Sequence, residues 1–216
     1  TNPTTPTYSK TYYVPYFEKT DNSWSGFALS NQLNASGTDV LATYYDNNGS
    51  TLGTQTLPQV AGRGQNTSLV SVSGSGWIKL QATATLHGCV LIGNNNVSEP
   101  MYDITLASSL SASLLIPHLD TTAQSWKSTA IFCNPQGSQA TLTLMYYAQD
   151  GTQPFSAAQV TIPANGAAQV DLSTHFPNRA GGSVGINSTQ AIAGFLLFDN
   201  QATGAKQRAG LTIPGQ

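Results

Sequence analysis

Histidine and carboxylate side chains are the first residues to weigh for nucleophilic or acid–base chemistry, and here they form no recognisable group. The three histidines, His87, His118 and His175, lie in unlike sequence contexts. A Ser-His-Asp triad needs a histidine that is oriented by a carboxylate. We therefore expect no catalytic residues, and we predict that the chain is not an enzyme.

The acidic residues are few, and most of them stand in predicted turns. The chain has ten Asp and Glu residues, of which Glu18 and Glu99 are the two glutamates. Asp21, Asp46 and Asp150 lie in turn-like segments, where Asp is favoured for local hydrogen bonding. The segment that begins at Asp46 is loosely similar to a calcium loop. We expect it to form a turn, and we predict no carboxylate pair for glycoside hydrolysis, no metal site and no cofactor.

Four aromatic side chains are better candidates for binding. Trp24 and Trp126 each follow a polar loop at the start of a predicted strand, and Tyr45 and Tyr147 are predicted to point outward. Exposed aromatic rings bind sugars or proteins at low entropic cost. Both pairs also have a structural interpretation, because a Trp can plug the end of a sandwich core and a Tyr can lie in a domain interface.

Charge is scarce in this chain, and its scarcity limits the possible partners. Asp, Glu, Lys and Arg make up 8% of the residues, against about 25% in an average soluble domain. The formal net charge is -2, and the eight Lys and Arg residues form no cluster. Phosphate backbones would find no basic patch, so we expect no nucleic-acid partner. No apolar run approaches the length of a membrane helix, so we expect no membrane span.

The sequence contains an internal repeat. A shift of 102 positions superposes several residues in order, and the shift becomes 106 further along. The superposed residues are Pro15 and Pro117, Trp24 and Trp126, Tyr44 and Tyr146, Tyr45 and Tyr147, Gly49 and Gly151, and then Gly88 and Gly194. The second copy therefore gains four residues, which belong in a loop. We predict two domains, residues 1–108 and 109–216.

Each copy is predicted to consist of short strands. β-Branched and aromatic residues alternate with polar ones between Gly, Asn, Asp and Pro, and no helical period persists. The strands predicted in the first copy lie near residues 9–17, 25–32, 38–46, 50–57, 65–72, 76–83, 85–93 and 101–107. This density of strands and turns is typical of a sandwich. The predicted fold class is all-β, with two tandem Ig-like or jelly-roll-type antiparallel β-sandwich domains related by internal duplication.

Two features leave alternatives open. Leu86 to Ile92 is apolar on both faces, and such a strand is usually covered on both sides. The cover is either packing within or between the sandwiches or a subunit interface. Cys89 and Cys133 fall in different copies, so they are either two inert thiols or a bridge between the domains.

The repeated segments resemble a known module once they are laid out together. Each copy has a strand that ends in Pro, a Trp that opens a strand ending in Asn, a Tyr-rich hairpin strand with a Gly turn, and a closing strand with a central Gly. The matching segments are 12–16 and 114–118, 24–31 and 126–134, 38–49 and 140–151, and 76–93 and 182–199. They resemble a tandem β-sandwich module that recurs in secreted bacterial proteins of mostly unassigned function. The second copy departs from the pattern with Ser183 in place of Trp77. The resemblance implies export and a sandwich, and it implies no activity.

These observations favour a non-enzymatic, secreted or cell-surface structural or adhesive protein that could act as a self-assembling subunit. Its partner would be protein, through self-association or a surface partner, or a glycan. The alternative function is a carbohydrate-binding module that stacks sugars on Trp24, Trp126, Tyr45 or Tyr147. The expected location is extracellular or on the cell surface.

Overall fold

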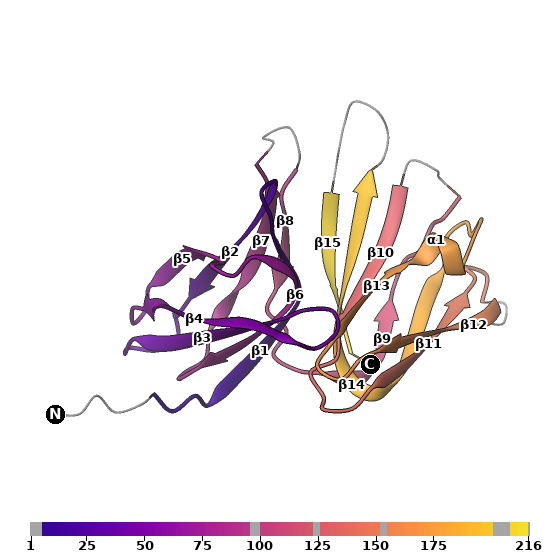
Figure 1. Cartoon of the computed structure of the whole chain (residues 1–216). Coiled ribbons are helices and arrows are strands. Elements are labelled where there is room, and N and C mark those ends of the chain that lie inside the picture. Colours follow the sequence, from indigo (N-terminus) through magenta and orange to yellow (C-terminus); the bar gives the residue numbers. More distant parts are fainter. Residues whose placement is uncertain (1–5, 96–99, 123–125, 152–154, 201–207, 216) are drawn as a thin grey trace.

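The computed structural model describes residues 6–95, 100–122, 126–151, 155–200 and 208–215, which form antiparallel strands almost throughout (Figure 1). In chain order the elements are β1 (Lys10–Lys19), β2 (Ser23–Ser30), β3 (Thr38–Tyr45), β4 (Thr51–Val60), β5 (Gln65–Leu69), β6 (Gly74–Ala82), β7 (His87–Asn94), β8 (Tyr102–Thr105), β9 (Ser111–Ile116), β10 (Trp126–Cys133), β11 (Ala140–Tyr147), β12 (Phe155–Ile162), β13 (Ala167–Asp171), α1 (Leu172–His175), β14 (Ser183–Asn200) and β15 (Arg208–Ile213). Within these ranges no helix is long and apolar enough to cross a membrane.

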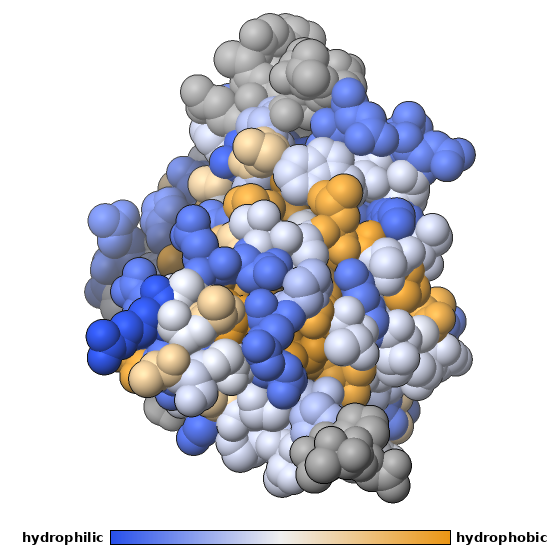
Figure 2. All heavy atoms as spheres, turned by 90° about the vertical axis from the view of Figure 1, so that its left-hand side faces the viewer, coloured by the Kyte–Doolittle hydropathy of each residue, from blue (hydrophilic) through white to orange (hydrophobic). Residues whose placement is uncertain are grey.

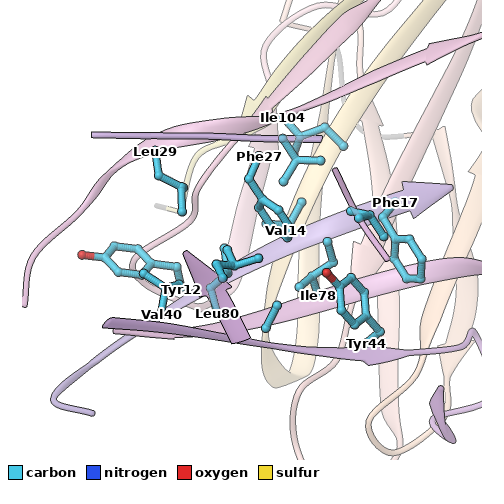
Figure 3. Packing of buried hydrophobic residues seen from close by; sticks show 14 of the residues in the cluster. Tyr12, Val14, Phe17, Phe27, Leu29, Val40, Tyr44, Ile78, Leu80 and Ile104 are labelled. Carbon is cyan, nitrogen blue, oxygen red and sulfur yellow. The ribbon is translucent and has the colours of Figure 1, made fainter. Parts of the chain in front are cut away.

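Strands β1 to β8 form the first module, a sandwich of two four-stranded sheets. The sheet orders are β1-β6-β3-β4 and β5-β2-β7-β8. Burial alternates along β3 because successive side chains point to opposite faces of a sheet. The inward side chains, among them Val14, Phe27, Tyr44 and Ile78, form one core between the sheets (Figure 3). All eight predicted strands occur, and the predicted antiparallel sandwich is confirmed.

Strands β9 to β15 form the second module, which repeats the strand pairing of the first. Its long strand β14 takes the places of both β6 and β7. The first half of β14 pairs with β9 and β11, and its second half pairs with β10 and β15. One strand thus passes from one layer into the other, which joins both layers into a seven-stranded sheet. The predicted boundary after residue 108 falls in the segment between β8 and β9.

The four extra residues of the second copy fall between β13 and β14, where the chain forms α1. Asp171 caps this helix by accepting a hydrogen bond from the Ser173 backbone N–H at 3.0 Å. Below it, the Phe176 ring packs near the Tyr146 ring, with 6.0 Å between centroids. The insertion therefore adds a short helix at a loop, as a tolerated insertion should.

The second module packs its β10–β14 face against the side of the first module that lies between β1 and β8. Ile131 and Phe195 are buried in the core of the first module. The Phe195 ring stacks on Tyr102 with 6.0 Å between centroids and 17° between planes. Burial raises the pKa of Tyr16, which also has hydrogen bonds to Glu18 and Gln169. This module contact covers apolar side chains that would otherwise be exposed.

Trp77 anchors a second part of the module contact. Its side chain is 1% exposed, its ring stacks on Tyr45 at 4.5 Å, and its Nε1–H donates to the Asn165 carbonyl oxygen at 2.7 Å. Cys133, Ala167 and Ala193 of the second module complete its surroundings. Tyr45 therefore lies in the contact between the modules, which is one of the two positions expected for it.

The β3–β4 turn that begins at Asp46 also joins this contact. The Asp46 carboxylate accepts the backbone N–H groups of Asn48 and Ser50 at 2.9 and 2.8 Å, which closes the turn. The Asn47 carbonyl oxygen accepts the Ala167 N–H at 3.1 Å. Gly49 has a φ of +91°, and a Cβ there would lie 2.1 Å from the Ala164 oxygen. The loop is thus a turn that fits closely against the second module.

Candidate functional site: an open groove in the second module

The four aromatic residues predicted to bind do not come together. Trp24 is half-buried on the outer face of the β5-β2-β7-β8 sheet, and Tyr45 lies under Trp77. Tyr147 is half-buried on β11, where its hydroxyl contacts the Met145 sulfur at 3.9 Å. Trp126 is the most open of the four, with 37% of its side chain exposed. Trp126 is therefore the most accessible of the four to a binding partner.

Trp24 and Trp126 are not equivalent, although their spacing predicts that they are. In the first module Trp24 pairs with Gly93, and in the second module Lys127 pairs with Asp199. Gly93 corresponds to Asp199 under the shift of 106 that holds in this part of the repeat. Lys127 is therefore the residue that corresponds to Trp24. The second copy has one extra residue before β10 and one fewer after it. The prediction of a Trp kept at the same place in both copies is wrong.

The buried asparagines after β2 and β10 confirm this corrected register. Asn31 donates from its side chain to the Val60 carbonyl oxygen at 3.2 Å, and Asn134 donates to that of Pro163 at 2.9 Å. Asn31 therefore corresponds to Asn134. Cys133, which the simple shift aligns with Asn31, corresponds to Ser30.

The most open aromatic residue lines a groove of about 420 Å³ between the two layers of the second module. We call it the Trp126 groove; its described lining residues are His118, Asp120, Trp126, Ser128, Phe198 and Ala209. It is open for a structural reason. Strand β1 continues to Lys19, whereas its counterpart β9 ends at Ile116. Residues 117–121 stay joined to the chain before β14 through single bonds, such as the Leu119 N–H to the Gly182 carbonyl oxygen at 2.9 Å, but they form no strand beside Ser128.

Ser128 at the floor of the groove shows the effect of the shorter strand. In the first module the equivalent Ser25 hydroxyl donates to the Glu18 carbonyl oxygen at 2.7 Å and accepts its N–H at 3.0 Å. The Ser128 hydroxyl is buried and has no hydrogen-bond partner in the part of the chain that the structure describes. A buried hydroxyl without a partner costs free energy. The groove thus offers one unsatisfied polar group beneath an exposed aromatic ring.

The groove brings together a serine, a histidine and an aspartate, yet their geometry does not form a triad. A nucleophilic serine must be hydrogen-bonded to its base, and the Ser128 hydroxyl makes no such bond. The Asp120 carboxylate accepts hydrogen bonds from the Thr122 N–H and hydroxyl at 2.9 and 2.6 Å. These contacts serve a local turn, so the groove resembles a binding surface more than a nucleophilic centre.

Residues 181–185 read Gly-Gly-Ser-Val-Gly, which is the pattern of a nucleophile elbow. Our sequence predictions did not include this motif. An elbow places its serine on a sharp turn from a strand into a helix. Ser183 instead begins β14 and pairs with Tyr147. No hydrogen bond within the described ranges joins it to His118, which lines the same 320 Å³ cavity. The motif therefore has strand geometry here.

A larger cavity of about 640 Å³ lies where β1, the β6–β7 turn and the segment after β8 meet. His87 and Lys10 are its titratable side chains besides Tyr12 and Tyr13, and its described lining includes no carboxylate. The Tyr12 hydroxyl already accepts the Leu86 N–H at 2.8 Å. In the described ranges no group of three or more His, Cys, Asp or Glu side chains could hold a metal ion.

The two cysteines are both free thiols, so the alternative of a bridge between the domains is wrong. Cys133 is fully buried, and burial raises its pKa to about 12. Cys89 lies half-buried on the outer face of β7, where burial and the nearby Asp103 charge raise its pKa. Each thiol is held in its protonated, less reactive form.

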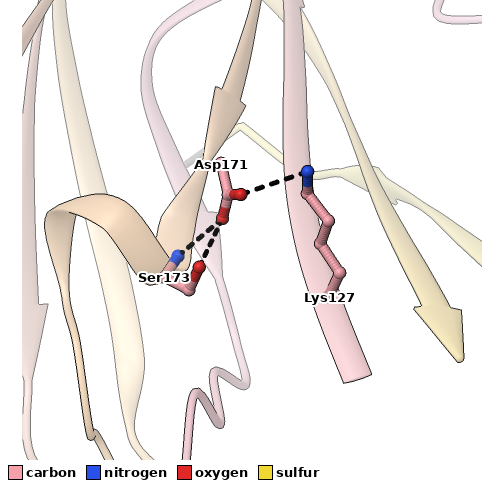
Figure 4. A network of polar contacts seen from close by, with 3 residues as sticks. All are labelled: Lys127, Asp171 and Ser173. Atoms are coloured by element: carbon pink, nitrogen blue, oxygen red, sulfur yellow. Dashed lines mark hydrogen bonds and ion pairs between the residues drawn. The ribbon is translucent and has the colours of Figure 1, made fainter. Parts of the chain in front are cut away.

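An ion pair occupies the position on the second module that corresponds to Trp24 on the first. The Lys127 ammonium lies 3.1 Å from the Asp171 carboxylate, which also accepts the Ser173 hydroxyl at 2.7 Å (Figure 4). Partial burial acts to raise the pKa of Asp171, but the hydrogen bonds from Ser173 and Lys127 outweigh it and hold that pKa below its ordinary value. The pair is well exposed to solvent and therefore contributes little stability.

The Trp126 groove corresponds, residue by residue, to the surface with which the first module binds the second. Across three neighbouring strands, Ser128, Phe198 and Ala209 take the places of Ser25, Ile92 and Tyr102. At the edge, Leu119 bonds to Gly182 as Phe17 pairs with Gly76, which puts His118 and Asp120 in the places of Tyr16 and Glu18. In the first module this surface is filled by Phe195 and Ile131. In the second module no described residue fills it.

Comparison with known proteins leaves the family of this chain open. No family model matches it, and no curated protein matches it. Among solved structures, Thermotoga maritima 1070 is 11% identical, with a TM-score of 0.45 over 49% of this chain and 95% of that one. Anabaena sensory rhodopsin transducer is 17% identical, with a TM-score of 0.35 over 39% and 92%.

A further similarity is to Bacteroides uniformis β-glucuronidase 2, which is 10% identical with a TM-score of 0.19. It covers 95% of this chain, and this chain spans 26% of that enzyme. With TM-scores below 0.5, none of the three similarities supports an argument about function.

Proposed function

We propose that this chain is a non-enzymatic structural or adhesive protein, secreted or displayed at a cell surface, that binds protein through the open end of its tandem. One observation carries the proposal: the Trp126 groove is the second module's version of a surface that already forms a packed protein interface in the first. Scarce charge and a surface rich in neutral hydrogen-bonding residues agree with this role.

The groove has the composition of a protein-binding site. Exposed Trp residues are enriched among the side chains that dominate interface energies. Trp126 stands at the rim beside the partly buried Phe198. Leu211 on the neighbouring strand β15 is 41% exposed, whereas its counterpart Ile104 in the first module is fully buried. Apolar side chains that the module contact covers in one copy therefore stand open in the other.

The test is the size of the protein in its native setting. Protein prepared from its natural source should be part of a larger assembly by light scattering or electron microscopy. Trp126→Ala should release it, since a Trp that acts as an interface hot spot contributes about 2 kcal/mol or more of binding free energy. Leu33→Ala is the matched control, because Leu33 is 73% exposed in the loop after β2. A monomer without partners, unchanged by Trp126→Ala, would overturn the proposal.

A second candidate function, carbohydrate binding, is favoured by the same exposed ring. Trp126 offers a stacking face, and His118 and Asp120 offer polar atoms beside it. A glycan array should then give hits that Trp126→Ala removes and Trp24→Ala leaves. Absence of hits, or hits indifferent to Trp126, rejects this candidate.

A further inference from the structure

We infer that the partner of the Trp126 groove is a second copy of this chain, bound by the outer face of its first module. The inference rests on the proposed function and names its partner. The face consists of the outward side chains of the β5-β2-β7-β8 sheet; those used below are Trp24, Ala28, Leu69, Cys89 and Leu91. We call it the β2–β7 face.

The module contact within the chain joins two unlike surfaces. A groove on the first module receives the β10–β14 face of the second module. Each module thus has one groove and one face, and the tandem uses the groove of the first and the face of the second. Among the described residues, none occupies the groove of the second module or covers the face of the first. Contacts between unlike surfaces build rings or open filaments when they repeat between copies.

The β2–β7 face matches the β10–β14 face, which the second module uses in the module contact. Ala28 pairs with Cys89 as Ile131 pairs with Phe195, so these residues occupy equivalent places. Leu91 likewise corresponds to Leu197. The face keeps apolar side chains at the positions that enter the groove in the intact tandem. It is a sheet face of the same geometry, with smaller side chains at its centre.

Groove and face both differ from their counterparts in the module contact. The groove has Ala209 where the first module has Tyr102, and Trp126 where the first module has Ser23. The loss of the Tyr102 ring enlarges the centre of the groove, and Trp126 adds volume at its rim. Because Cys89 replaces Phe195 on the face, both surfaces lose volume at the centre, and the contact depends on the Trp126 rim.

Apolar side chains replace an ion pair on the β2–β7 face. Trp24 and Leu69 occupy the places of Lys127 and Asp171. Trp24 Cζ3 and Leu69 Cδ2 both lie about 3.5 Å from where a Cβ on Gly26 would be, and Leu69 is 66% exposed. The first module thus presents a Trp and a Leu to solvent where the second module presents charges.

Figure 2 views the first module from the side turned away from the second. Hydrophobic residues appear there as orange patches divided by polar side chains, without one continuous apolar surface. The groove of the second module also lacks a Trp77 equivalent, since Ser183 stands in its place. The contact between copies should therefore be weaker than the module contact and should depend on concentration.

The test uses the whole chain with one surface altered at a time. Leu91→Asp alters the β2–β7 face at the position whose counterpart, Leu197, packs against the core of the first module in the tandem. Leu211→Asp alters the groove side at an edge strand. Leu33→Asp is the matched control. Circular dichroism and thermal melts establish that each variant is folded before its size is measured.

Sedimentation velocity over a concentration series should show oligomers for the natural chain and for Leu33→Asp. Each surface variant alone should be a monomer. An equimolar mixture of the two surface variants should give a heterodimer, because each retains the surface that the other lacks. Labelling of Cys89 by a maleimide should slow on oligomer formation, while Cys133 stays unreactive throughout.

The outcomes separate this inference from the proposed function. Oligomers that persist in both variants, or variants that fail to form a heterodimer on mixing, would overturn the head-to-tail contact. A purified chain that stays monomeric at all concentrations, but that occurs in assemblies in its native source, overturns the second copy as partner and leaves the proposed function standing. A monomer in both settings overturns both.

Discussion

Removal of the Trp77 side chain should uncouple the two modules. Trp77 is the largest fully buried side chain in the contact between the modules, and substitution of a buried aromatic residue by Ala costs about 3–5 kcal/mol. That range includes the hydrogen bond from Nε1 to the Asn165 oxygen, which by itself is worth about 1 kcal/mol. For a chain of this size, about 4 kcal/mol lowers the melting temperature by roughly 8–16 °C.

Calorimetry and two optical probes distinguish uncoupling from general destabilisation. The natural chain should unfold in one transition, because Ile131 and Phe195 belong to the core of the first module. Trp77→Ala should separate that transition into two. Trp77→Phe keeps a ring against Tyr45 but loses the N–H donor, so it should cost only about 1 kcal/mol. A melting temperature lowered by less than about 4 °C, with one transition retained, would refute the assignment of Trp77 as the anchor.

Three further predictions concern the turn, the ion pair and the thiols. Gly49→Ala should loosen the module contact more than Gly151→Ala, because both glycines have positive φ but only a Cβ at Gly49 would strike the other module; hydrogen exchange at the contact measures the difference. Asp171→Ala should lower stability by about 1 kcal/mol at neutral pH through loss of the helix cap. Because the folded-state pKa of Asp171 is depressed, its contribution is present above the unfolded pKa of about 3.9 and is lost as pH falls through the folded pKa, so melts of variant and natural chain should converge in acid. Thiol titration should find Cys89 reactive in the native monomer, with a pH profile displaced toward alkali, and Cys133 reactive only after unfolding; equal native reactivity would contradict the burial of Cys133.

The strands could be predicted from the sequence because alternation of apolar and polar residues directly reflects which face of a sheet is buried. All eight strands of the first module follow from that pattern. The fusion of the two corresponding strands into β14 could not be predicted in this way. Residues 192–196 are buried on both faces, so no alternation remains there to distinguish a turn between layers from a strand that continues.

The candidate site was only partly accessible from the sequence. Trp126 was selected as an aromatic residue after a polar loop, and it does line the groove. Its supposed match with Trp24 failed because a shift of one residue in a strand moves every side chain to the other face. Trp24 lies on the outer face of its sheet, whereas Trp126 lies at the space between the layers. Identical residue types at a constant spacing concealed that difference.

The residues that differ between the copies carry more information about function than those that are kept. Residues that repeat, such as Tyr44 and Tyr146, lie in the sandwich cores and maintain the fold. Trp77 has no repeat because its partner is the second module, and Ser183 has no such neighbour among the described residues. Phe195 fills the first module's core from outside, while its counterpart Cys89 remains half-exposed. A duplicated chain that packs one unlike surface on another must leave one of each kind at its ends, so those unmatched positions are where a partner should bind.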